Sequence, residues 1–188
     1  NDEARGILAL LKQHGIKTQL WTPMSDPAPK AKDQVAKITA AANVLRPIAE
    51  EADRIECTIA LYNHGSWFGE PENQLAIIEH LRLKNVGIVY NLHHGHDHLG
   101  RFPKLLEQMK PHLWALNLNG MVKNGDQIGK KILPLGHGDL DLDLLKTIAA
   151  SGYRGPIGIL GHTMDDAEER LRDNLDGLDW LVPQLQGK

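Results

Sequence analysis

The feature that most constrains this chain is a short apolar run followed by His, Asn or Gly, which recurs five times. Short apolar runs are typical of parallel β-strands that are buried on both faces. In parallel α/β folds, the residues just after the strands meet on one face. The pattern therefore predicts a polar site built at strand ends. The five segments span residues 59–65, 86–98, 113–120, 134–139 and 156–162.

Segments with helical spacing alternate with the predicted strands. Regular alternation of this kind predicts βαβ units, a parallel sheet and a single domain over residues 1–188. About five units are present, which fits either an open doubly wound sheet or part of a (βα)8 barrel. The predicted strands are 16–21, 57–62, 86–90, 112–118 and 156–160. The predicted helices are 3–14, 33–54, 70–83, 102–109, 140–150 and 165–181, with a kink or break at Pro47 and an N-cap at Thr163.

Composition excludes several classes of function. The net charge is −3 and the basic residues are scattered, so no nucleic-acid-binding surface is predicted. No apolar stretch approaches the roughly 20 residues of a membrane span, which predicts a soluble protein without a membrane partner. The single cysteine, Cys57, excludes an internal disulfide and is expected to be a buried thiol. Neither Gly-rich phosphate-binding fingerprint occurs, which disfavours a nucleotide site.

The start of the chain also carries information. It has no initiator Met and begins within a predicted helix, which suggests a processed or truncated product. The cellular compartment is therefore not determined by the sequence.

Three histidines recur at equivalent strand-end positions, namely His64, His94 and His162. Neutral imidazole donates and accepts hydrogen bonds and titrates near neutral pH, which suits acid–base chemistry on a hydroxylated substrate. The alternative is that these side chains cap backbone groups at the strand ends. The neighbouring residues predicted to orient a substrate are Tyr62, Asn63, Asn91, Asn117 and Trp67.

Other polar and aromatic residues near these positions each have two possible interpretations. Trp67 and Phe68 either stack on a sugar ring or only cover the mouth of the site. Glu70 is either a base or a residue that starts a helix. The run His96-Asp97-His98 is expected to be a solvated loop, and a His-rich tract can also bind metal.

Several of these segments resemble the xylose isomerase-like TIM-barrel superfamily, which includes sugar phosphate isomerases and epimerases. The segment 59–64, Ile-Ala-Leu-Tyr-Asn-His, resembles the family strand that ends L-A-L-E-N-H. The family turn L-G-x-G-x-[IL]-D is matched by 135–141, and Y-x-G-x-[IL]-x-[IL]-E by 153–160, except for its last residue. The resemblance covers about residues 16–181 and implies a partial (βα)8 barrel, with about three N-terminal units missing. It also implies that a preceding segment or a second chain closes the sheet.

The resemblance implies a divalent metal held by Glu, Asp, His and Glu at four strand ends. The matching residues here are Tyr62, Asn91, Asn117 and Leu160, so none of the usual ligands is present. Hard divalent ions prefer carboxylate oxygen. A transition metal held by His64, His94 and His162 and a metal-free sugar site both remain open.

The residues and the resemblance together predict an isomerase- or epimerase-like enzyme. It would move a proton next to the carbonyl of a sugar or keto-sugar. A lyase or hydratase acting on keto-glycosides is a close alternative, because it starts with the same proton abstraction. A non-catalytic sugar-binding or assembly subunit is the third reading, and the loss of the metal ligands motivates it.

Overall fold

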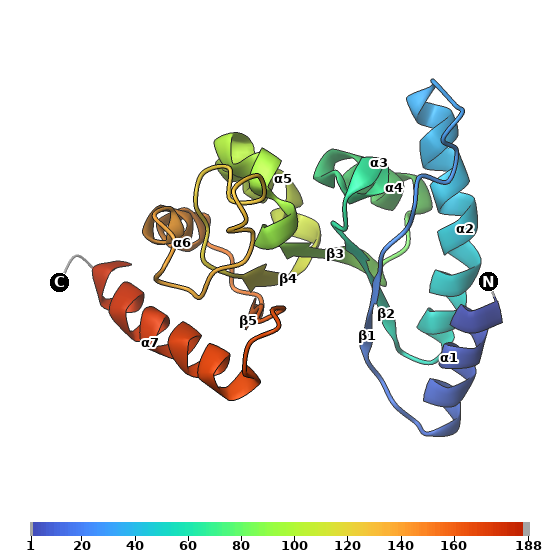
Figure 1. The fold of residues 1–188 in the computed structure, drawn as a ribbon. Helices are drawn as coiled ribbons and strands as arrows, with labels where there is room; N and C mark the ends of the chain where they lie inside the picture. The colour runs from blue at the N-terminus through green and yellow to red at the C-terminus, as the bar shows by residue number, and fades with distance from the viewer. Residues whose placement is uncertain (1, 186–188) are drawn as a thin grey trace. The chain divides into compact units, whose positions relative to one another are not determined.

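A computed structural model describes residues 2–185 and has the predicted α/β architecture (Figure 1). The strand order is β1-β2-β3-β4-β5, so strands consecutive in sequence are neighbours in the sheet, and the described pairings β1–β2, β2–β3 and β4–β5 are parallel. This order and direction confirm the expected class, a partial TIM barrel of about five βα units. The strands are β1 (Gln19–Thr22), β2 (Thr58–Tyr62), β3 (Val86–Asn91), β4 (Leu113–Leu118) and β5 (Ile157–Ile159).

Helices connect the strands close to the predicted places. The α-helices are α1 (Asp2–Gln13), α2 (Gln34–Arg54), α3 (Ser66–Gly69), α4 (Pro71–Leu81), α5 (Phe102–Met109), α6 (Asp141–Ala150) and α7 (Ala167–Leu185). The 3₁₀ helices are η1 (Leu92–His94), η2 (His96–Arg101) and η3 (Lys110–His112). Among residues 2–185, no helix combines the length and the apolar character needed to cross a bilayer.

The chain divides into two compact units, Asn1–Val89 and Tyr90–Lys188. The prediction of one domain over residues 1–188 stays a prediction. In the first unit, α2 contacts β2, α1 and α4, and α1 lies beside α2 in Figure 1. The buried face of α2 consists of small and aliphatic side chains, which lets the helix approach its neighbours closely. These residues are Ala41, Ala42, Leu45, Ala49 and Ala52.

The start of α2 follows the expected capping chemistry. Asp33 accepts hydrogen bonds from the backbone N–H groups of Val35 and Ala36, each at 3.2 Å. Pro47 lies inside α2, which continues as a single helix through to Arg54. Of the two predicted outcomes, the break into two helices is therefore wrong, and the kink stays a prediction. Cys57 is buried, as predicted, and its sulfur accepts a hydrogen bond from the N–H of Thr18 at 3.4 Å.

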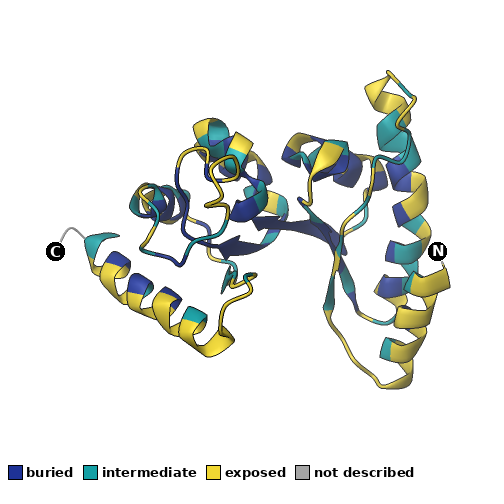
Figure 2. Cartoon of the chain, in the orientation of Figure 1, coloured by how far each residue is buried: buried dark blue, intermediate teal, exposed yellow. Residues whose placement is uncertain are grey.

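In the second unit, α7 packs on α6 and on the turn 134–138, and Figure 2 shows buried positions along one face of α7. Asn174 of α7 accepts a hydrogen bond from the backbone N–H of Leu135 at 2.9 Å. Gly177 allows this contact, because a Cβ there would lie 1.7 Å from the carbonyl oxygen of Leu135. The predicted N-cap of α7 at Thr163 is wrong. Asp166, next to the first helical residue, accepts from the N–H groups of Glu168 and Glu169 instead.

The same turn is held from α6 by one buried carboxylate. Asp141 accepts hydrogen bonds from the backbone N–H groups of Met121, Gly136 and Gly138 at 2.6, 2.8 and 3.0 Å. Burial raises the pKa of this carboxyl, and the three N–H donors oppose that rise. This is the Asp of the matched turn motif, so in this chain the motif organises the long loop between β4 and α6.

Replacing Asp141 by Ala is expected to lower the free energy of unfolding by about 2–4 kcal/mol, because three backbone donors lose their acceptor. Urea unfolding of the purified variant measures the loss. Asp143→Ala is the matched control, because Asp143 lies in the first turn of the same helix and is exposed. Equal stability of the two variants would show that Asp141 does not organise the loop.

Tyr153 predicts an alkaline dependence of stability. Its hydroxyl donates to the carbonyl of Pro156 at 3.0 Å, and burial raises its pKa from the ordinary 10.0 to about 12. The folded state therefore holds this proton more tightly than the unfolded chain. The stabilisation is fully present below pH 10 and is lost as the pH rises towards 12. Between those values, the unfolding free energy of the wild type should fall more steeply than that of Tyr153→Phe, and parallel curves would contradict the assignment.

Candidate active site

The ends of β1 and β2 form a pocket in the first unit. Thr22 pairs with Leu61 in parallel register, so the loops that follow the two strands leave the same edge of the sheet. Between these loops is an open cavity of about 420 Å³. Its lining comes only from the two loops and consists of Pro23, Met24, Ser25, His64, Gly65 and Ser66.

His64 is the titratable side chain among those lining residues, and it is exposed to solvent. Its ring centroid lies 5.6 Å from that of Tyr62, which in turn lies 6.3 Å from the ring of Trp21. Burial raises the pKa of Tyr62, so its phenol stays protonated at neutral pH and can donate a hydrogen bond. Asn63, between the two, is buried. The structure thus brings His64 and Tyr62 together at one strand end.

The backbone after β2 turns sharply to present His64. The N–H of His64 donates to the carbonyl of Tyr62 at 2.7 Å, and that of Gly65 donates to Asn63 at 3.1 Å. Gly65 has φ +56°, a left-handed conformation that favours glycine. Gly69 packs behind this turn, because a Cβ there would lie 3.1 Å from the backbone carbon of His64.

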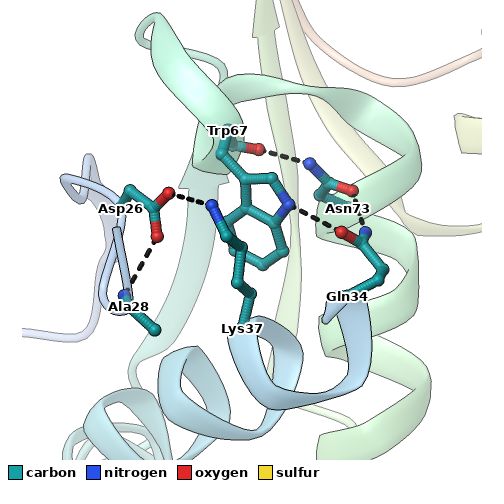
Figure 3. A network of polar contacts seen from close by, with 6 residues as sticks. All are labelled: Asp26, Ala28, Gln34, Lys37, Trp67 and Asn73. Carbon is teal, nitrogen blue, oxygen red and sulfur yellow. Dashed lines mark hydrogen bonds and ion pairs between the residues drawn. The ribbon is translucent and has the colours of Figure 1, made fainter. Parts of the chain in front are cut away.

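Trp67 is half-buried and engaged on two sides in a polar network, drawn in Figure 3. Its indole N–H donates to the side-chain oxygen of Gln34 at 2.8 Å, and the Lys37 ammonium lies 5.7 Å from its ring centroid. Lys37 already lies over one face of the Trp67 ring, which favours the interpretation that Trp67 covers the mouth of the site over stacking on a sugar. Phe68 is fully buried, in keeping with a covering role.

The network of Figure 3 also includes Asp26 and Asn73. Lys37 forms an ion pair with Asp26, which follows β1, and this hydrogen bond is the main cause that lowers the pKa of the Asp26 carboxyl. Asn73 of α4 accepts from the amide of Gln34 and donates to the Trp67 carbonyl at 2.6 Å. Glu70 holds the N-cap position of α4, and its carbonyl accepts from Asn73 at 3.0 Å, which fits its helix-start reading.

The second unit holds the other predicted site residues. Asn91 is the buried last residue of β3, and His94 is half-buried in η1, with its ring centroid 3.6 Å from that of buried His93. His162 is exposed in the segment after β5. Leu160 donates its N–H to Leu118 at 2.8 Å, so the segment leaves β5 beside the end of β4.

Asn117 lies on β4 and fits against a glycine of the next strand. It is 8% exposed and pairs in register with Gly158 of β5. A Cβ at Gly158 would lie 2.3 Å from the side-chain oxygen of Asn117. Glycine at 158 therefore makes the space in which the Asn117 amide sits.

The expectation of a solvated loop at 96–98 is wrong for two of its residues. The segment forms η2, and His98 is buried, with its Nδ1 hydrogen-bonded to the hydroxyl of Tyr90 at 2.8 Å. The side chain of His96 is 5% exposed and its Nε2 lies 3.0 Å from the carbonyl of Lys131. Only Asp97 is exposed. Tertiary contacts within the second unit thus engage two of the chain's histidines structurally.

The residues at the family's metal positions do not fit its metal. A phenol, two carboxamides and an aliphatic side chain stand there, at Tyr62, Asn91, Asn117 and Leu160. Within residues 2–185, no group of three or more His, Cys, Asp or Glu side chains is arranged to hold a metal ion.

The parallel strands and their connecting helices define an α/β barrel-type protein, and comparison with known proteins agrees on this fold. The family profile described as xylose isomerase-like TIM barrel matches residues 2–183. The chain belongs to this xylose isomerase-like TIM-barrel family. No curated protein matches the sequence significantly.

Solved structures of the same fold are similar over nearly the whole chain. One is the apo form of the 3-keto-D-glucoside 4-epimerase YcjR from E. coli, with TM-score 0.69 and 18% identity over 97% of this chain and 70% of that one. The IOLI protein with a binding zinc atom has TM-score 0.74 and 18% identity, covering 98% and 69%. The probable 3-DHS dehydratase AsbF from Bacillus anthracis has TM-score 0.73 and 11% identity, covering 95% and 69%. At such identities the likeness establishes the fold.

Sequence reasoning missed the network around Trp67. Lys37 and Gln34 read as polar positions of an amphipathic helix, and Asp26 as part of a Pro-rich loop. No local pattern joins residues 26, 37 and 67, because only the parallel strand pairing makes them neighbours. Asp141 did have a signal in the sequence, since it ends the segment 135–141 that resembles the family's turn motif.

Substituting Gly158 by Ala is expected to destabilise the protein by about 1–3 kcal/mol, since the new Cβ overlaps the Asn117 amide. When Asn117 is already Ala, Gly158→Ala should cause little further destabilisation, because the overlapping amide is gone. The double variant should therefore be about as stable as Asn117→Ala alone. Urea unfolding of the four proteins closes the cycle. Additive losses would contradict the close fit between these two residues.

Proposed function

We propose that this protein is an acid–base enzyme that moves a proton next to the carbonyl of a sugar or keto-sugar. The observation that carries the proposal is His64, an exposed imidazole in a pocket of about 420 Å³ formed by two strand-end loops. Two serine hydroxyls, Ser25 and Ser66, line the same pocket and suit a hydroxylated ligand. The epimerases and isomerases of the same fold support this class of reaction.

In the proposed reaction, neutral His64 removes the proton from the carbon beside the carbonyl. The C–H electron pair becomes the new C=C bond, and the carbonyl oxygen becomes an enolate. The Tyr62 phenol is available to donate a hydrogen bond to that oxygen, because its pKa is raised. Return of a proton to the opposite face of the same carbon gives epimerisation. In isomerisation the enolate oxygen also takes up a proton and the neighbouring hydroxyl loses one, so that the new C=O forms at the first carbon and the carbon-bound proton goes to the former carbonyl carbon. Asn63 is the first unit's own candidate for orienting a substrate hydroxyl. The roles predicted for His94 and His162 as acid or base, and for Asn91 and Asn117 in orienting the substrate, stay predictions.

The charge of the pocket supports a substrate without a phosphate group. None of its six lining residues is Lys or Arg. The nearby Lys37 is already neutralised by Asp26. This part of the site therefore offers no cation to a phosphate, and an uncharged sugar or keto-sugar is the better match.

The test is hydrogen–deuterium exchange in D₂O. The purified protein is incubated with a panel of ketoses and 3-keto-glucosides, and deuterium at the carbons beside the carbonyl is followed by NMR. Exchange should exceed the protein-free rate, and His64→Ala should lower it by about 10²–10⁴-fold. His14→Ala is the matched control, because His14 is exposed in the same unit and follows α1.

The remaining outcomes separate the alternatives. Exchange accompanied by loss of water or of the glycosidic group would favour the lyase or hydratase reading, for which the dehydratase of the same fold is a precedent. Binding of the panel sugars without exchange by the wild type would favour the non-catalytic sugar-binding subunit. Exchange that persists unchanged in His64→Ala would exclude His64 as the base.

A further inference from the structure

We propose that Lys37 is a positioning residue for His64, and that it acts by joining the two loops that form the pocket. This inference rests on the proposed function for its catalytic meaning. Lys37 lies in α2, outside the pocket lining, and reaches Asp26 on one side and the Trp67 ring on the other (Figure 3). It is therefore placed to act on the site through other residues.

We refer to Lys37 and its two contact residues, Asp26 and Trp67, as the clamp. Asp26 and Trp67 are each bonded through the backbone to a residue that lines the pocket. Asp26 directly follows Ser25, and Trp67 directly follows Ser66. A displacement of Asp26 or Trp67 must therefore move a serine that lines the pocket. Lys37 bridges the walls from behind, so its contacts set how far apart the two loops stand.

Two further residues, Gln34 and Asn73, hold the Trp67 end of the clamp in place. Gln34 accepts the Trp67 indole N–H at 2.8 Å, and Asn73 holds both Gln34 and the Trp67 carbonyl. Trp67 is thus held by its ring face, its ring nitrogen and its backbone. Three residues before it in the chain is His64, and the tight turn at Gly65 transmits a shift at Trp67 to the imidazole.

The burial of the ion pair makes it more than an ordinary surface contact. The side chains of Lys37 and Asp26 are 16% and 19% exposed, whereas those of Lys17 and Glu56 in the same unit are 59% and 71% exposed. Exposed pairs contribute little because water and salt screen them. Removal of one partner from a shielded pair leaves a charge that must move to reach water. Loss of Lys37 or Asp26 should therefore rearrange the loops.

The experiment compares wild type, Lys37→Met, Lys37→Arg and Lys17→Met by NMR of the Trp indole N–H groups and the His rings. Methionine keeps the length and apolar stem of Lys37 but removes its charge. In Lys37→Met, the Trp67 indole and His64 ring resonances should both shift, and Trp67 indole exchange should accelerate at least about tenfold. Lys37→Arg should largely restore both signals, and Lys17→Met should leave both unchanged.

The kinetic readout uses the panel ketose that exchanges fastest in D₂O. Lys37→Met should lower its exchange rate by about 10- to 100-fold, the scale expected from a small misplacement of a catalytic group. Asp26→Asn should give a similar loss, and the double variant should be little worse than either single one. If Lys37→Met does not fold, Asp26→Asn carries the same comparison, because it removes the same ion pair.

The outcomes for Lys37 and for the proposed function are separate. An unchanged His64 resonance in a Lys37→Met protein whose Trp67 signal moves would overturn the positioning role, whatever the protein catalyses. Absence of deuterium exchange of the panel sugars with the wild type would instead contradict the proposed function. The NMR coupling between Lys37 and His64 needs no substrate, so it would still show that the clamp sets the pocket.

Discussion

The parallel register between β1 and β2 is the constraint on which the first unit depends. Thr22 lies opposite Leu61, so both strands end at nearly the same level and their loops emerge together. One loop brings Ser25 and Asp26, and the other brings His64 and Trp67. Because side chains alternate along a strand, a slip of one residue in this register would exchange the side chains on the two faces of β2. The pairing of the two strands thus determines where the pocket lies, independently of the side-chain contacts within it.

In the second unit, the segment that must be held in place after a strand is a long loop. The segment between β4 and α6 is held by the Asp141 carboxylate from one helix and by Asn174 from another. Gly177 removes the side chain that would otherwise separate α7 from the turn. A buried acceptor and a missing Cβ together fix backbone that has few ladder hydrogen bonds of its own.

The chemistry at the strand ends differs from that of the family to which the chain belongs. At the positions where the family pattern has metal-binding carboxylates and a histidine, this chain has Tyr62, Asn91 and Asn117, whose side chains can form hydrogen bonds, and Leu160, whose side chain cannot. In the proposed function, amides and a protonated phenol orient hydroxyls and an exposed imidazole exchanges protons. The fold would then supply the strand-end location, and this chain's own residues the chemistry.

The sequence by itself determined the α/β class, the order of strands and helices and the strand-end location of the polar residues, because those depend on local periodicity. It also pointed to Asp141 through a motif. Only the tertiary structure decided that His98 is buried against Tyr90 and that Lys37 bridges Asp26 and Trp67. These contacts join residues brought together by bends and strand pairing, and no local pattern of apolar and polar residues encodes them.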